Sequence, residues 1–251
     1  MLRLGYGLLL PAALLGVWSL GTSLHWWPTS IIAGPDAAVK ALWRLAVSGA
    51  LLQHTQVSLG RLALGCAIGF IVGVSTASIV ALTPTVNMIV RPTIDFLAPV
   101  PILSWIPVFI VFFGIDGARI ALIATGTGLI IYSATLTAIR DTNADYIDVA
   151  RLYAKSRFDI LKHISLPGGA WSLFGAVRIA LGLSWVLLLA SELIASSEGL
   201  GWLIWDSRNF SRADEMMAGM MWVGLLGFLL DRAVGSIQAR VTAWRPTFSG
   251  L

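Results

Sequence analysis

The chain has 251 residues, of which 57% are hydrophobic and only 12% are charged. This composition excludes an ordinary soluble domain and indicates a protein that crosses a membrane several times. The net charge of +4 does not by itself indicate a nucleic-acid partner, because basic residues of membrane proteins gather in cytoplasmic loops.

Six apolar stretches are long enough to cross a bilayer, which takes about 20 residues in a helix. The first follows Arg3 like the apolar part of a signal peptide, but it has no clear cleavage site and five more follow, so we expect an uncleaved helix. The sequence predicts an all-α, polytopic membrane protein with six transmembrane helices, at residues 6–24, 57–81, 86–113 (interrupted), 118–139, 172–195 and 216–237.

We divide the chain into three parts. Residues 1–55 hold the first transmembrane helix and, in PDAAVKALWRLAVSGALLQ, the apolar spacing of a short amphipathic helix on the outer surface. Residues 56–240 form the membrane core, which includes a polar segment at 140–171, and residues 241–251 form a cytoplasmic tail.

The second and third spans carry packing signals. Gly65, Gly69 and Gly73 repeat every four residues, a pattern that favours close contact with another helix. The third span, RPTIDFLAPVPILSWIPVFIVFFG, contains four prolines, each of which removes a backbone donor and disturbs the preceding turn. Such a broken helix is tolerated where protein or water satisfies the freed carbonyls, so the prolines serve either packing or a transport pathway.

The distribution of Lys and Arg predicts that both termini are cytoplasmic. Six spans put the termini, the 82–91 loop and the 140–171 segment on one side of the membrane. That side then holds eleven basic residues: Arg3, Arg91, Arg140, Arg151, Lys155, Arg157, Lys162, Arg178, Arg232, Arg240 and Arg245. The outer side holds six: Lys40, Arg44, Arg61, Arg119, Arg208 and Arg212.

The polar segment has more structure than a connection needs. Thr142 followed by Asp145 is a capping-box pattern, which predicts a helix that starts near Asn143. Ala150 and Ala154 leave one face of this helix flat, and Arg151 and Lys155 form a basic row beside it. After Ser156, RFDILKHI predicts a second short helix that ends at Leu166, Pro167 and two glycines. The segment therefore resembles a docking element.

Catalytic and metal sites have little support in the sequence. Cys66 lies in an apolar run and is interpreted as a packing residue, and the three histidines have no metal-ligand neighbour at helical spacing. The chain contains no phosphate loop of the type Gly-x4-Gly-Lys-Ser/Thr. We therefore predict no metal site, no catalytic residue and no cofactor bound by this chain.

The polar segment resembles the EAA loop of ABC importer permeases, a motif of an acid and two small residues followed by I-x-L-P. The matching residues are Asp148, Ala150, Ala154, Ile164, Leu166 and Pro167. Two positions differ from the usual motif, because Asp148 stands where Glu is common and Ala154 where Gly is common. The loss of Gly makes the turn between the two helices less permissive.

The resemblance extends over residues 28–245 and is strongest to the permeases for nitrate, sulfonates and taurine. It is carried by TQVSLGRLALGCAIGFIVGV, FLAPVPILSWIPVFIVFFGI, RIALGLSWVLLLASELIASSEGLGWLI and VGLLGFLLD, and the tail RVTAWRP is similar to the end of taurine permeases.

The resemblance implies the type I ABC importer permease fold, with cytoplasmic coupling helices between spans 4 and 5. It implies import of a small anion, with taurine or another organic sulfonate favoured over nitrate or bicarbonate. The partners that it implies are two ATP-binding subunits that carry ATP and Mg, an external substrate-binding protein and a second copy of the chain in a bacterial inner membrane. Coupling to the ATPases would then rest on Asp148, Ala150, Arg151, Ala154, Lys155, Ile164, Leu166 and Pro167.

An anion pathway should offer hydrogen-bond donors, and the spans contain Ser104, Thr125, Thr127, Ser184 and Trp185. Trp105 is a further candidate, although Trp105 and Trp185 are more often packing residues. Glu192 and Asp95 lie inside spans, where an ionised group is costly unless it is paired or faces water. Asp95 could pair with Arg91 or with Arg178, and both acids could serve either structure or the pathway.

The rival hypothesis is a proton-coupled secondary transporter or channel that uses Glu192 or Asp95. It predicts uptake that follows the proton gradient and needs no partner subunit.

Overall fold

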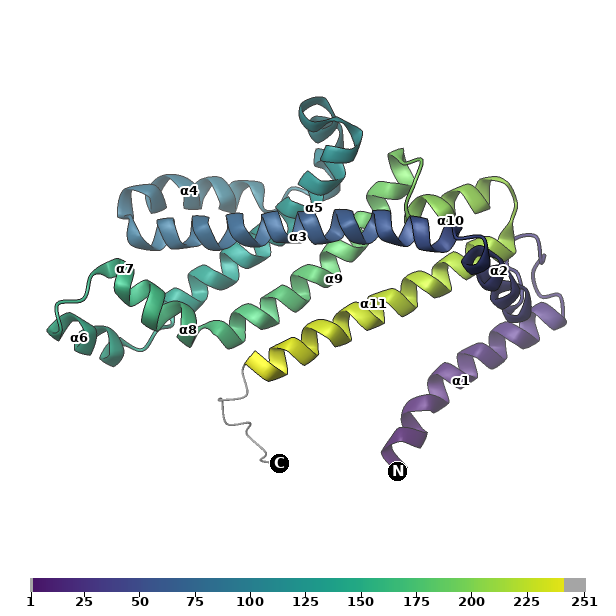
Figure 1. The fold of residues 1–251 in the computed structure, drawn as a ribbon, viewed down its shortest axis with the longest axis horizontal. Helices are drawn as coiled ribbons and strands as arrows, with labels where there is room; N and C mark the ends of the chain where they lie inside the picture. Colours follow the sequence, from purple (N-terminus) through teal and green to yellow (C-terminus); the bar gives the residue numbers. More distant parts are fainter. Residues whose placement is uncertain (1, 242–251) are drawn as a thin grey trace. The chain divides into compact units, whose positions relative to one another are not determined.

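The computed structural model is all-helical over the residues that it describes, 2–241, with side chains described from residue 9 onward except that of residue 195. Figure 1 shows the elements in chain order. They are α1 Leu2–Ser23, α2 Pro35–Val47, α3 Ala50–Leu82, α4 Pro84–Leu97, η1 Ile102–Trp105, α5 Ile106–Arg140, α6 Ala144–Leu152, α7 Arg157–Ile160, η2 Leu161–Ser165, α8 Leu166–Gly168, α9 Ala170–Ala195, α10 Leu200–Asn209 and α11 Ala213–Val241. The predicted tail at 241–251 lies outside the described residues except for Val241.

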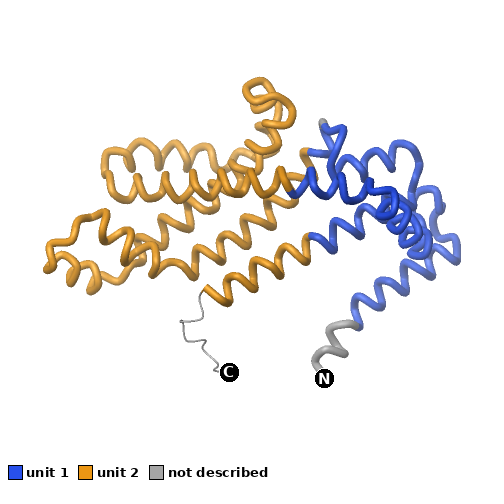
Figure 2. Tube along the Cα trace, in the orientation of Figure 1, with its two compact units in different colours: residues 1–59, 192–226 blue, residues 60–191, 227–251 orange. Residues whose placement is uncertain are grey.

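The chain forms two compact units (Figure 2). Unit 1 contains residues 1–59 and 192–226, and unit 2 contains residues 60–191 and 227–251. Each unit is therefore built from segments that are distant in the sequence.

In unit 2, α3 lies against α5 through the predicted glycine face. A Cβ atom on Gly65 would stand 2.6 Å from Ile123, one on Gly69 2.6 Å from Thr127, and one on Gly73 2.8 Å from the carbonyl oxygen of Gly128. Because the contacted residues advance along α5 in the same order as the glycines along α3, the two helices run parallel. The small-residue prediction is confirmed, and the close approach explains why these positions lack a side chain.

Helix α9 packs on α5 in the opposite direction. Leu187 clusters with Leu122, whereas Ala176 and Ala180 cluster with Ile131. The order of these partners is reversed along α5, so α5 and α9 are antiparallel. The segment α6–α8 connects them at the end where α5 finishes and α9 begins (Figure 1).

The interrupted third span appears as α4, a break at residues 98–101, and the start of α5. Pro101 precedes η1 and Pro107 lies in the first turn of α5, where the missing donor is tolerated. We predicted separate helices at 86–113 and 118–139, and helical geometry is interrupted between them, inside the stretch labelled α5. Its backbone turns at Gly114, with φ 70° and ψ 178°, values that a glycine adopts without a Cβ clash.

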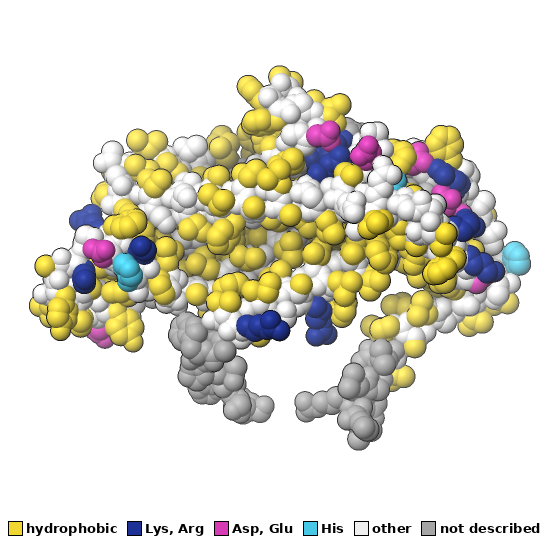
Figure 3. Space-filling view, in the orientation of Figure 1, with side chains coloured by type: hydrophobic (Ala, Val, Ile, Leu, Met, Phe, Trp, Pro, Cys, Tyr) yellow, Lys and Arg dark blue, Asp and Glu magenta, His cyan; other side chains and the backbone are white. Residues whose placement is uncertain are grey.

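Four helices in the described residues are long and apolar enough to cross a membrane, namely α3, the η1–α5 stretch at Ile102–Arg140, α9 over Ala170–Ile194, and α11. The part of α1 whose side chains are described, Leu9–Ser23, is a shorter apolar helix. Figure 3 shows many hydrophobic side chains on the visible face of the long helices, as expected for helices that contact lipid.

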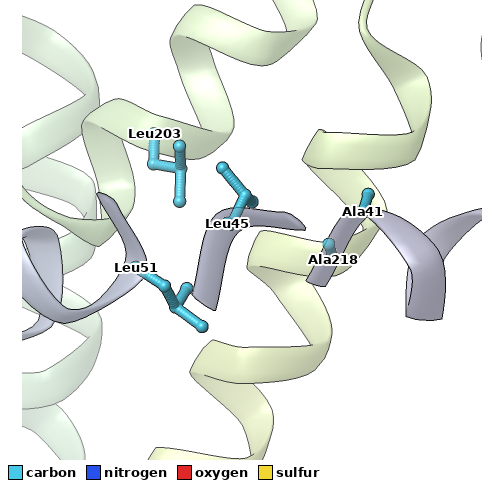
Figure 4. Close-up of a cluster of buried hydrophobic side chains, with 5 residues drawn as sticks. All are labelled: Ala41, Leu45, Leu51, Leu203 and Ala218. Atoms are coloured by element: carbon cyan, nitrogen blue, oxygen red, sulfur yellow. The ribbon is translucent and has the colours of Figure 1, made fainter. Parts of the chain in front are cut away.

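Unit 1 has its own apolar core, drawn in Figure 4. Ala41 and Leu45 of α2 meet Leu51 of α3, Leu203 of α10 and Ala218 of α11. Lys40 and Arg44 of α2 are exposed, so α2 is amphipathic, while its place on the outer surface stays a prediction. Its buried face covers the first turns of α3 and α11.

Candidate functional site

The segment at residues 140–171 begins with a capped helix. The side chain of Asn143 accepts a hydrogen bond from the backbone N–H of Asp145, at 2.8 Å, and α6 starts at the next residue, Ala144. The predicted start is therefore confirmed, but the predicted capping box is wrong, because the hydroxyl of Thr142 donates back to the carbonyl of Ala138. Asn143 satisfies the free amide instead.

The turn after α6 depends on Ala154. Its φ is +52°, in the left-handed region where a Cβ atom is unfavourable. The N–H groups of Ala154 and Lys155 donate to the carbonyls of Arg151 and Ala150, which closes the helix end. Ala154 thus occupies the position where the EAA motif usually has glycine, and the geometry explains that preference.

The second helix starts with a full capping box. The hydroxyl of Ser156 accepts from the N–H of Asp159 at 3.1 Å, and the carboxylate of Asp159 accepts from the N–H of Ser156 at 3.3 Å. The hydrogen bond from the Ser156 hydroxyl, followed by the one from its backbone N–H, lowers the pKa of Asp159. These bonds hold the acid ionised at the positive end of α7.

The helical stretch that begins with α7 ends among Leu166, Pro167 and the two glycines, as predicted. The chain passes through the π-helical turn η2 and the short α8, and it then caps at Gly169 before α9 begins. A Cβ atom on Gly169 would stand 2.5 Å from the Cβ of Ala138. The glycine therefore lets this junction approach the end of α5.

A groove of about 700 Å³ opens on one side of the segment. Four of the predicted coupling residues line it: Ala150, Lys155, Ile164 and Pro167. Tyr146 and Tyr153 add exposed aromatic rings. This combination of apolar wall and charged rim suits contact with another protein.

The remaining coupling residues lie around this groove. Asp148 is exposed and accepts from Arg151 at 3.1 Å, one helical turn away. Arg151 and Lys155 also line a second cavity of about 620 Å³, together with Arg157. Leu166 is half-buried in α8. All eight residues lie in this one short segment, in which Ala150 is buried and Ala154 is exposed.

Among the predicted pathway residues, Thr127 and Ser184 lie together. Their hydroxyl oxygens are 2.8 Å apart in the interface between α5 and α9, and both side chains are buried. In this conformation the two hydroxyls hold the helices together.

The other predicted donors are dispersed within unit 2. Thr125 lines a groove of about 610 Å³ between α3, α4 and α5, Ser104 is exposed in η1, and Trp105 stacks on Phe109. Trp185 borders a small cavity of about 60 Å³, where it lies close to Gly227 of α11. The structure does not gather these side chains into one pocket.

Asp95 pairs with Arg91 at 3.7 Å, as one of the two alternatives predicted, and both side chains are exposed. The other alternative is wrong, because Arg178 binds Asp231 of α11 through two guanidinium nitrogens. Asp231 is a partner that the sequence patterns did not identify.

Glu192 is fully buried in unit 1, where it caps a helix. Its carboxylate accepts from the hydroxyl of Ser58, at 2.8 and 2.9 Å, and from the N–H of Gly201 in the first turn of α10. Gly199 has φ +112°, and a Cβ atom there would stand 2.3 Å from the carboxylate. Of the two roles considered for Glu192, this geometry favours structural pairing.

Arg61, Asp116 and Arg119 form a group of charges that the sequence patterns did not identify. Asp116 accepts from Arg61 of α3 and from Arg119 of α5. The sequence signal was available, because each arginine immediately precedes a long apolar run, but its partner depended on the kink at Gly114.

Comparisons with known proteins agree with the fold. Residues 69–243 match the family described as "Binding-protein-dependent transport system inner membrane component". The aliphatic sulfonates transport permease protein SsuC of Escherichia coli is 34% identical over 95% of this chain and 91% of its own. The taurine transport system permease protein TauC of the same organism is 29% identical over 93% of this chain and 87% of its own.

The fold is also similar to a solved structure of the MetNI methionine ABC transporter in an inward-facing conformation. The TM-score is 0.66 at 18% sequence identity, over 78% of this chain and 98% of that one. This structural match covers most of residues 69–243, the region that matches the family. The fold and the sequence comparison therefore agree. The chain belongs to the inner-membrane permease components of binding-protein-dependent ABC importers.

Proposed function

We propose that this permease imports a small organic sulfonate such as taurine. The observation that carries the proposal is the 34% identity to an aliphatic sulfonate permease along nearly the whole of both chains. Nitrate and bicarbonate are the competing substrates, because they are also small oxyanions. Two separate ATPase subunits, which bind ATP and Mg, would supply the energy.

The segment at 140–171 would receive that energy. Its groove and exposed tyrosines offer a surface to an ATPase subunit, and capped helices on both sides of Ala154 make the segment stiff enough to transmit movement. Because α5 and α9 enter and leave it directly, a push on this segment tilts both helices. Alternating access to the two sides of the membrane follows from that tilt.

The proposed assembly contains two copies of the chain, two ATPase subunits and an external binding protein. A symmetric pair would place the pathway between equivalent helices. Positive residues near the 140–171 segment and the 82–91 loop support cytoplasmic termini. In the pathway, Ser184 and Trp185 are the first candidates to donate hydrogen bonds to the anion, with Ser104 and Thr125 as others.

The decisive experiment reconstitutes the complex and measures uptake and ATPase activity with taurine, an alkanesulfonate, nitrate and bicarbonate. Sulfonate uptake that is sensitive to vanadate and requires the ATPases supports the proposal. Uptake that follows an imposed proton gradient without ATPases would support the rival transporter hypothesis instead. Ser184→Ala and Trp185→Ala are expected to slow uptake at normal expression; unchanged uptake removes these residues from the pathway.

A further inference from the structure

Two arginines from different helices converge on one carboxylate oxygen in unit 2. A guanidinium nitrogen of Arg61 in α3 lies 2.7 Å from Oδ1 of Asp116, and one of Arg119 in α5 lies 2.5 Å from the same atom. The side chains of Arg61 and Arg119 are only 12% and 5% exposed, whereas that of Asp116 is 74% exposed. Two buried cations therefore hold an acid that remains accessible.

The packing of α3 on α5 accounts for this convergence. Gly65 faces Ile123 and Gly69 faces Thr127. Arg61 and Arg119 come one helical turn before Gly65 and Ile123, so they lie beside each other in the same way. The turn at Gly114 comes two residues before Asp116 and directs the chain away from the earlier part of α5. The arrangement is thus fixed by the same glycine contacts that join the two helices.

The energetic cost of this arrangement points to a role in transport. Arginine side chains at the ends of membrane helices usually extend to water, and those kept inside protein tend to mark ion or substrate pathways. Arg61 and Arg119 are held inward although each directly precedes an apolar run. Removing two guanidinium groups from water is energetically costly, even where an acid pairs with them.

An oxyanion matches this site chemically. A guanidinium presents N–H donors in a planar fork that fits two oxygens of a carboxylate, sulfonate or phosphate. A sulfonate has three equivalent oxygens, so it can accept from both arginines at once. Asp116 contributes an oxygen of the same kind from an exposed side chain, which an incoming anion can replace.

We propose that Arg61 and Arg119 bind the oxyanion group of the transported solute, and that Asp116 occupies this site between transport events. The group is a sulfonate if the proposed function holds, and the inference rests on that function. Competition from Asp116 keeps the affinity of this site for the oxyanion modest. A modest affinity suits a transport pathway, because a tightly held ion is released slowly.

The test measures binding of radiolabelled taurine to the reconstituted permease–ATPase complex without the external protein, and taurine uptake by the complete complex. Arg61→Lys and Arg119→Lys keep the charge but lose the planar fork, so the half-saturating taurine concentration should rise about tenfold, equivalent to ~1.4 kcal/mol. Asp116→Asn removes the competing charge and should lower that concentration severalfold. Arg44→Lys is the control, because Arg44 pairs with Asp214 on an exposed surface.

The opposite directions of these effects make the test independent of folding. Misfolding would weaken binding in every variant, whereas the proposal requires Asp116→Asn to strengthen it. Weaker binding in Asp116→Asn, or unchanged binding in both arginine variants, overturns the proposal.

The outcome with the unmodified complex separates this proposal from the proposed function. If that complex transports nitrate and not taurine, the sulfonate function fails, and the same variants measured with nitrate decide the arginine site. If it transports only an uncharged solute, both fail.

Discussion

The carboxylate of Glu192 accepts a hydrogen bond from the hydroxyl of Ser58, 134 residues earlier in the chain, and both side chains are fully buried. The same hydroxyl accepts from the N–H of Leu200, and the same carboxylate accepts from the N–H of Gly201. Together they cap α10, whose own N-cap residue, Gly199, has no side chain to do so. Three segments of unit 1 are joined at this point.

Replacement of Glu192 by alanine should therefore destabilise unit 1. The Ser58 hydroxyl and the Gly201 amide would lose an acceptor. Each buried donor left without a hydrogen-bond partner lowers the free energy of unfolding by about 1–3 kcal/mol. Glu192→Gln keeps an oxygen acceptor and should lose less. Thermal unfolding of the purified complex measures the difference, with Asp36→Ala, at an exposed position on α2, as the control.

The same pair of variants tests the rival role of Glu192. A proton-coupling acid cannot be replaced by glutamine without loss of transport. We expect Glu192→Gln to retain ATP-driven uptake. Abolished uptake in a complex of normal stability would contradict the capping role.

The α3–α5 contact predicts different effects for two glycines of one helix. Gly69→Ala would place a Cβ atom 2.6 Å from the carbonyl oxygen of Ala124, which is backbone and cannot move aside. Gly60→Ala meets nothing within 4 Å, so it should be neutral or stabilise α3 by up to ~1 kcal/mol. Expression level and melting temperature of the two variants give the comparison. Equal effects would show that α3 does not approach α5 as described.

Two alanines of the segment at residues 140–171 should respond in opposite ways to replacement by glycine. Ala154 has φ +52°, so Ala154→Gly should relieve strain and stabilise the segment by about 1 kcal/mol. Ala150 is helical and buried, so Ala150→Gly should destabilise it by about 0.5–1 kcal/mol. Hydrogen exchange of residues 144–160 reports both. A bulky charged residue at 154 should also uncouple ATP hydrolysis from uptake.

The capping box of α7 predicts a dependence on acid. The folded pKa of Asp159 lies below its ordinary value of 3.8 because Ser156 donates to it. The stabilisation of α7 by ionised Asp159 is therefore complete above the pKa that Asp159 has in the unfolded protein. It is lost as the pH falls through the lower pKa that Asp159 has in the folded protein. Amide exchange of α7 should accelerate in Asp159→Asn at pH 7, and the difference from the unmodified protein should shrink below about pH 3.8. A difference that persists in acid would exclude the ionised cap.

Much of the fold followed from local patterns. Apolar length located the long helices, the spacing of Gly65, Gly69 and Gly73 identified a contact face, and Ser156 marked a helix start. These features succeed because bilayer thickness, close packing and capping act over a few neighbouring residues. The resemblance of residues 148–167 to the EAA motif indicated the family, and the comparisons with known proteins confirm it.

The partners of the charged groups were decided by the tertiary structure. Arg178 pairs with Asp231 and not with Asp95, and Glu192 accepts a hydrogen bond from Ser58. Arg61 and Arg119 both pair with Asp116. In each case the partner lies on another helix, or beyond a kink. Sequence alone determined which residues carry charge and which stretches are apolar enough to cross a membrane. Only the packing of those helices decided which charges meet, because the pairing depends on helix register and direction over many residues.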